Sequence, residues 1–162
     1  MRNRILTFTL ATAAIAASTA VIAGGAQARV PWCDTSRMQL EVTAGDQLGS
    51  NLRTANITLR NMSWETCATQ GYPGVDLSIW GGPGHHAVRN GAVGHPIELA
   101  PRQAATAVLT YQIFTVATDN FPDEITVTPP DNTESLRAYW DWRKLGAVSF
   151  DQSQPSIAPL RA

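Results

Sequence analysis

The segment TANITLRN at residues 54–61 decides the fold class, because polar and apolar residues alternate along it without a break. Its apolar members are Ala55, Ile57 and Leu59. Successive side chains of a β-strand point to opposite faces of the sheet, so this pattern predicts a strand with one buried and one exposed face. A surface helix would instead place its apolar residues three and four positions apart.

Similar period-two segments recur along the chain, separated by turn-forming stretches such as Gly81-Gly82-Pro83-Gly84 and Pro129-Pro130-Asp131-Asn132. Short alternating strands at intervals of roughly ten residues are typical of an antiparallel β-sandwich, here with about seven to eight strands. The segment 104–116 is apolar on both faces, and we interpret it as one long strand. The other predicted strands span residues 37–43, 75–79, 97–99, 125–128 and 136–141.

Residues 1–28 have the composition of a secretory signal peptide. Arg2 and Arg4 form a basic start, an uncharged stretch follows, and Ala26-Gln27-Ala28 matches a small-x-small cleavage site. The alternative is an uncleaved membrane anchor, but a stretch rich in Ala and Thr is weakly hydrophobic for that role. We therefore expect cleavage before Arg29 and a secreted, extracellular protein with no membrane segment after cleavage.

The charge of the mature chain argues against nucleic acid as a partner. The signal peptide contains two of the 12 basic residues and none of the 13 acidic ones, so the mature chain carries a net charge of −3. A mildly acidic chain without a Lys/Arg cluster lacks the electrostatic footprint of a nucleic-acid-binding protein. We expect one β-sandwich domain over residues 29–151, a loosely ordered tail over residues 152–162, and a monomer.

Two cysteines, Cys33 and Cys67, fit an oxidising compartment. A thiol nucleophile or a pair of metal ligands is the alternative, but the chain has no C-x-x-C spacing, which favours a disulfide. Cys33 precedes the strand at 37–43, and Cys67 follows the strand at 54–61. If those strands are antiparallel neighbours, the disulfide joins their shared end and does not link two strand interiors, as it would in an antibody domain.

A family resemblance rests on a series of motifs in a fixed order. The motifs are Cys33, Leu59-Arg60-Asn61, Cys67, Gly71-Tyr72-Pro73-Gly74-Val75, Ile97-Glu98-Leu99-Ala100-Pro101, the segment 104–111 and Val127-Thr128-Pro129-Pro130. From Cys33 to Pro130, the chain resembles the actinobacterial secreted domains known as domain of unknown function 4232. The resemblance implies an exported, immunoglobulin-like β-sandwich with one disulfide. It implies no catalytic residues, no cofactor and no agreed ligand.

Three histidines, His85, His86 and His95, lie in one glycine-rich connection and are the candidate metal ligands. Imidazole binds zinc and copper, and export makes copper available. Against this, adjacent histidines point in different directions, no carboxylate lies at ligand spacing, and both cysteines are assigned to the disulfide. Solvated loop histidines are the simpler interpretation.

Five tryptophans are many for a small exported domain, and some of them are candidates for a ligand surface. Trp80 falls on the polar side of its predicted strand. We expect the binding surface to lie on the loops at one end of the sandwich or on the sheet face of Trp80 and Tyr139, with Trp142 as a further candidate. Exposed aromatic rings beside polar groups can stack on a sugar or dock a protein. The alternative is that Trp140 and Trp142 belong to the core and that Trp32 and Trp64 cover the disulfide end.

No enzymatic signature is present in the sequence: there is no G-x-S-x-G, H-E-x-x-H or P-loop motif. Asp123 and Glu124 are adjacent, so on a strand they point to opposite faces and cannot flank one glycosidic bond. The sequence therefore predicts a secreted, non-catalytic binding module, with an unknown extracellular protein or a cell-wall glycan as partner. The alternative is an exported copper- or zinc-binding protein that uses the histidine loop.

Overall fold

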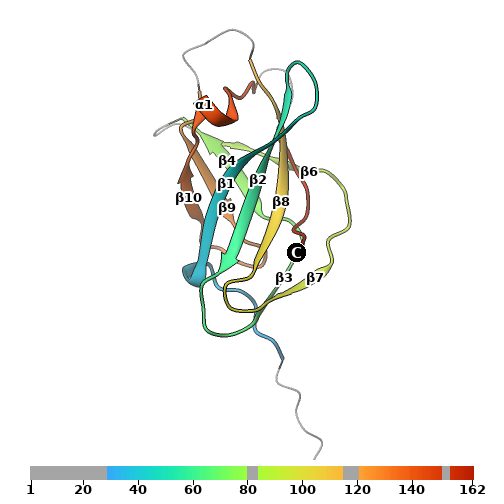
Figure 1. Ribbon diagram of the computed structural model, residues 1–162, viewed down its shortest axis with the longest axis vertical. Helices are drawn as coiled ribbons and strands as arrows, with labels where there is room; N and C mark the ends of the chain where they lie inside the picture. Colours follow the sequence, from blue (N-terminus) through green and yellow to red (C-terminus); the bar gives the residue numbers. More distant parts are fainter. Residues whose placement is uncertain (1–28, 80–83, 115–120, 151–153) are drawn as a thin grey trace, which may run out of the picture.

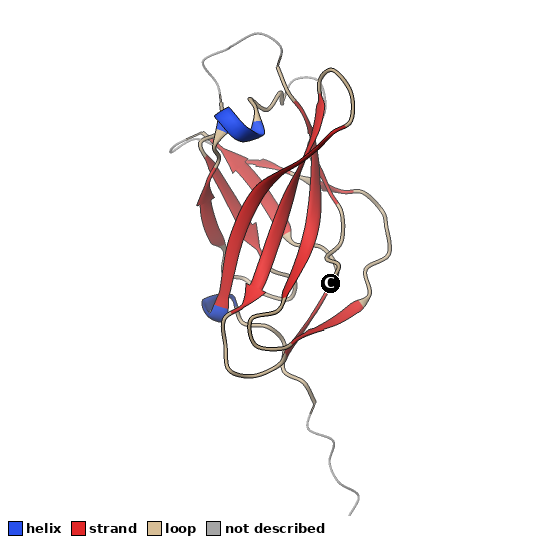
Figure 2. Ribbon diagram, in the orientation of Figure 1, coloured by secondary structure: helices blue, strands red, loops and turns tan. Residues whose placement is uncertain are grey.

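The computed structural model describes residues 29–79, 84–114, 121–150 and 154–162, and the predicted signal peptide lies outside them. Figure 2 shows that almost all regular structure in this part of the chain is strand. The predicted all-β fold with antiparallel sheets is confirmed. Among the described helices, none has the length and apolar character needed to cross a membrane.

The largest sheet has five strands in the order β1-β2-β8-β11-β6. All of its pairings are antiparallel except that of β11 with β6. The strands are β1 (Met38–Gln47), β2 (Leu52–Asn61), β8 (Ala104–Gln112), β11 (Ser156–Ile157) and β6 (Val88–Arg89). A short 3₁₀ turn, η1 (Thr35–Arg37), leads into β1.

A second sheet has the order β10-β9-β4-β5, and β3 pairs with β7 in a separate ribbon. Figure 1 shows β10, β9 and β4 as a layer beside β1, β2 and β8, with the short helix α1 at one end. The strands are β10 (Leu136–Tyr139), β9 (Glu124–Thr128), β4 (Gly74–Ser78), β5 (Gly84–His86), β3 (Cys67–Gln70) and β7 (Pro96–Leu99). Of these, β3 and β5 are not predicted by the sequence pattern, because each is short and lacks a clear alternation.

The core forms between the two layers from the apolar members of the alternating segments. Ala55, Ile57 and Leu59 of β2 are fully buried, as the alternation in residues 54–61 predicts. They belong to one cluster with residues of the other sheet, including Val75, Leu77, Ile125 and Val127. Burial of this apolar surface is the main free-energy gain that holds the layers together.

The predicted Cys33–Cys67 disulfide is present. It joins the segment before β1 to the first residue of β3, where the Cys33 N–H also donates to the Ala68 carbonyl at 2.8 Å. Asn61, at the end of β2, is buried beside this region. Its Nδ2 donates to the carbonyls of Glu65 and Leu99, each at 2.8 Å. The disulfide and this amide together fix the end of the sandwich opposite α1.

The chain leaves β10 earlier than the alternation in residues 136–141 predicts. Trp142 begins α1 (Trp142–Leu145), and the Asp141 carboxylate caps it by accepting from the Arg143 N–H at 3.2 Å. The alternative that places both Trp140 and Trp142 in the core is therefore correct only for Trp140, which is buried, whereas Trp142 is 42% exposed. The chain turns into a helix here in spite of the alternating pattern, because the Asp141 carboxylate accepts a hydrogen bond from a backbone N–H that the first turn of a helix leaves unpaired.

The expectation of a loosely ordered tail at residues 152–162 is also wrong for its described part. β11 completes the five-stranded sheet between β8 and β6, and Ile157 and Leu160 are buried. The Thr106 N–H donates to the Arg161 carbonyl at 2.7 Å, and the Arg161 N–H donates back at 2.9 Å. Prolines at 155 and 159 interrupt any alternation, so the sequence pattern does not predict this strand. It forms because β8 offers an unpaired edge.

Removing the disulfide should lower stability substantially. The bridge closes a sequence separation of 34 residues, and a loop of this size is worth about 3–4 kcal/mol on the chain-entropy model. We expect the Cys33→Ser/Cys67→Ser variant to unfold at a clearly lower urea concentration than the oxidised protein. Dithiothreitol should reproduce the loss in the wild type and change nothing in the variant. Equal midpoints for oxidised and reduced wild type would contradict a stabilising bridge.

Stability should also fall at alkaline pH because of Tyr111. This side chain is 1% exposed and donates its hydroxyl proton to the Leu145 carbonyl at 2.7 Å. Burial raises the pKa of Tyr111 from 10.0 to about 12, although the positive charge of Arg53 acts in the opposite direction. Between these values the unfolded chain loses a proton that the folded chain keeps, so the free energy of unfolding decreases as pH rises.

The measurement is urea unfolding between pH 8 and pH 11.5 for the wild type and for Tyr111→Phe. The variant should be less stable at pH 8, by about 1 kcal/mol for one lost hydrogen bond. It should also show a smaller alkaline decline, because the shifted group is gone. Parallel pH profiles for the two proteins would contradict the assignment to Tyr111.

Candidate functional site

The outer surface of the four-stranded sheet carries a continuous set of polar side chains, which we call the polar face. It arises from the alternation in β9 and β4, whose apolar residues point into the core. The strand register aligns Arg137, Thr126, Asp76 and His86 in one row across the four strands. The neighbouring row contains Tyr139, Glu124 and Ser78, and Thr128 follows along β9.

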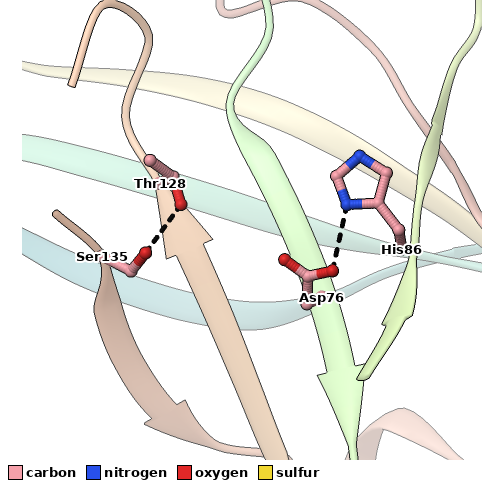
Figure 3. Close-up of polar contacts among 4 residues, drawn as sticks. All are labelled: Asp76, His86, Thr128 and Ser135. Carbon is pink, nitrogen blue, oxygen red and sulfur yellow. Dashed lines mark hydrogen bonds and ion pairs between the residues drawn. The ribbon is translucent and has the colours of Figure 1, made fainter. Parts of the chain in front are cut away.

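Three side-chain pairs organise this face. His86 Nδ1 lies 3.0 Å from Asp76 Oδ1, and Thr128 Oγ1 lies 2.7 Å from Ser135 Oγ, as Figure 3 shows. Arg137 Nη1 donates to Glu124 Oε1 at 3.3 Å. The His86 side chain is 65% exposed and that of Arg137 is 71% exposed. These are solvent-exposed pairs, and such pairs contribute little to stability.

Asp76 and His86 are two members of a possible hydrolytic triad, but the described residues do not complete it. A triad requires a nucleophilic hydroxyl within hydrogen-bond reach of the imidazole nitrogen that faces away from the carboxylate. The hydroxyls of Thr128 and Ser135 bond to each other instead. Figure 3 shows that pair apart from the histidine, with Asp76 between them. The pair of Asp76 and His86 is thus an exposed contact across two strands.

Tyr139 stands at the edge of the polar face and is 66% exposed. It borders an open depression of about 250 Å³ together with Asp123, Glu124, Arg137 and Ala138. The Asp123 N–H donates to the Ser78 carbonyl at 3.1 Å, which continues the contact between β9 and β4. The depression therefore combines an exposed aromatic ring with the ion pair of Glu124 and Arg137, and Oδ1 of Asp123 is buried beside it.

The three candidate metal ligands do not converge. His85 lies on the inner side of β5 and stacks on Phe150, with ring centroids 3.7 Å apart, whereas His86 bonds to Asp76 on the outer side. His95 is exposed and lies between β6 and β7. In the described residues, no group of three His, Cys, Asp or Glu side chains could hold a metal ion. Adjacent strand residues point to opposite faces, which separates His85 from His86.

The predicted aromatic ligand surface is divided by the structure. Trp80 lies outside the described residues, so its place on the polar face stays a prediction. Tyr139 is exposed on that face, but Trp142 lies on α1 beside a different depression. Trp64 is 90% exposed near the disulfide and Trp32 is 54% exposed, so neither covers that end closely.

A second depression of about 290 Å³ lies beside α1 at the end of the sandwich. We call it the α1 pocket, and none of the sequence patterns described above predicts it. Arg53 and Arg143 contribute its charged side chains. The signal was present in β2, because Arg53 is two residues before Ala55 and so lies on the strand's apolar face. The other lining residues are Ile113, Phe114, Phe121, Trp142, Gly146 and Ala147.

The comparison with protein families agrees with the order of motifs in the sequence. The model of the family described as "Domain of unknown function (DUF4232)" matches residues 33–160. This match begins at the first disulfide cysteine and includes β11 and the buried Leu160. Neither a curated protein nor a solved structure matches the chain. With most of its length matched, the chain belongs to the DUF4232 family.

Proposed function

We propose that this protein is a secreted, non-catalytic module that binds glycans through the polar face, with Tyr139 as its aromatic anchor. The observation that supports the proposal is the depression at Tyr139, where an exposed ring lies beside Asp123, Glu124 and Arg137. Export is supported by the basic and apolar start of the sequence and by the disulfide.

A sugar offers two chemical features that match this surface. The C–H groups on one side of a pyranose ring form an apolar patch that can lie on an aromatic ring. Its hydroxyls can donate to the carboxylate of Glu124 and accept from the guanidinium of Arg137, and hydrogen bonds to charged groups are the stronger kind. A neutral glycan also leaves the ion pair of Arg137 with Glu124 in place.

The arrangement of the polar face favours binding over catalysis. Its two ion pairs, His86 with Asp76 and Arg137 with Glu124, are open to solvent, and catalytic groups gain most of their effect where water is excluded. A flat sheet is nevertheless a rigid base for a long ligand, because each side chain is held in register by the strand beneath it. An extended polysaccharide can therefore contact several rows without any change in the fold.

The proposal is tested by titrating residues 29–162 with chitohexaose and laminarihexaose and following backbone amide shifts by NMR. We expect shifts in β9, β10 and the end of β4 for at least one of the two. Tyr139→Ala should weaken that binding about three- to tenfold, because it removes the stacking surface. Tyr139→Phe should keep the affinity, since the ring remains.

Trp64→Ala is the matched control, because Trp64 is 90% exposed but lies near the disulfide, at the other end of the sandwich. It should bind as the wild type does. An equal loss in Trp64→Ala would indicate non-specific aromatic adsorption. Titrations in which neither oligosaccharide shifts an amide of the polar face would overturn the proposal.

A further inference from the structure

Arg53 is a charged residue at a position where the alternation along β2 predicts an apolar core residue. It lies on the same side of β2 as the buried residues Ala55 and Ile57, and it pairs in register with the buried Tyr111 of β8. An arginine that points between two sheets carries a permanent charge into a poorly solvated place. Such a position requires a compensating partner.

The described residues supply no such partner. Arg53 takes part in none of the ion pairs found among the described residues, and its Nε is buried without a hydrogen-bond acceptor. An added Cβ at Gly146 would stand 3.4 Å from Arg53 Nη1, so the chain passes close over the guanidinium. A buried donor of this kind destabilises the fold while it stays unpaired.

A second arginine increases the charge imbalance of the α1 pocket. Arg143 lines the same depression, and its guanidinium carbon lies 5.6 Å from the centroid of the Trp142 ring. The described lining residues include two arginines and no carboxylate. The nearby Asp141 is already engaged, because its Oδ2 lies 3.2 Å from Lys144 Nζ. The described lining of the pocket thus carries a net positive charge that an anionic ligand would balance.

The remaining lining is aromatic and apolar. Phe121 and Trp142 stack with their ring centroids 5.7 Å apart and their planes 17° from parallel. Phe114 and Ile113 extend this apolar surface toward Arg53. Ligand sites of this kind combine an apolar lining, which takes up a flat hydrophobic body, with a few polar groups that fix its orientation.

We propose that the α1 pocket binds a small aromatic carboxylate, with the carboxylate held by Arg53 and Arg143 and the ring packed on Phe121 and Trp142. Guanidinium groups pair with carboxylates through parallel hydrogen bonds, which suits Arg53 better than a lysine in its place. Because Arg53 Nε is closed off from solvent, the carboxylate would meet Arg53 through the terminal N–H groups of its guanidinium. The pocket shares none of its lining residues with the depression at Tyr139, so this site is independent of the glycan proposal.

The test uses 2-naphthoate as the anionic probe and 2-naphthamide as its neutral counterpart. Binding to residues 29–162 is followed by isothermal titration calorimetry and by the NMR signal of the Arg53 Nε–H group. We expect 2-naphthoate to bind at least tenfold more tightly than 2-naphthamide and to shift the Arg53 signal. Its affinity should fall as ionic strength rises, because the contact is between charges at the surface end of a pocket.

Arg143→Gln tests the contact at an exposed position where the fold should tolerate it, and Lys144→Gln is its matched control on the same helix. We expect about a tenfold loss in Arg143→Gln, a loss of similar size in Arg53→Gln, and no change in Lys144→Gln. Equal affinity for acid and amide, or equal losses in Arg143→Gln and Lys144→Gln, would overturn the assignment. Undetectable binding of 2-naphthoate at millimolar concentration would overturn it as well.

Discussion

The pairing of β2 with β8 is the constraint on which the rest of the structure depends. Their register runs without a shift from Leu52 opposite Gln112 to Arg60 opposite Ala104. A slip of one residue would turn the buried face of β2 toward solvent and bring Thr and Asn side chains into the core. The five-stranded sheet is built outward from this pair: β1 adds to the free side of β2, and β11 adds to the free side of β8.

The two ends of the sandwich are closed by different chemistry. At one end, the disulfide joins the segment before β1 to β3, and the buried Asn61 amide joins the end of β2 to the end of β7. At the other end, Tyr111 and Trp140 donate to the carbonyls of Leu145 and Gly146, and their rings pack edge to face with centroids 5.1 Å apart. These contacts hold α1 over the end of the sheets and thereby shape the pocket beside it.

The two candidate surfaces differ because one is formed by the solvent side of its strands and the other by the core side. The polar face is the ordinary solvent side of a sheet, and its charges are paired within it. The α1 pocket is where the core side of β2 reaches the end of the sandwich while still carrying an arginine. A guanidinium whose Nε is buried without an acceptor among the described residues is unusual, whereas a paired charge on a sheet surface is common. That contrast points the two surfaces toward a neutral ligand and an anionic ligand, respectively.

The sequence by itself determined the strands with clear alternation, the disulfide and the family, because period-two burial and cysteine pairing in an oxidising compartment are local or compositional signals. It also indicated Tyr139 as an exposed ring, since Tyr139 lies opposite the apolar side of its strand. Only the tertiary structure decided the stacking of His85 on Phe150, the change from strand to helix at Trp142, and the use of β11 as a sheet strand. Each of these depends on which segment lies beside another in space, and a two-residue strand or a four-residue helix forms only where a neighbour supplies the hydrogen bonds and the buried surface that so short a segment lacks.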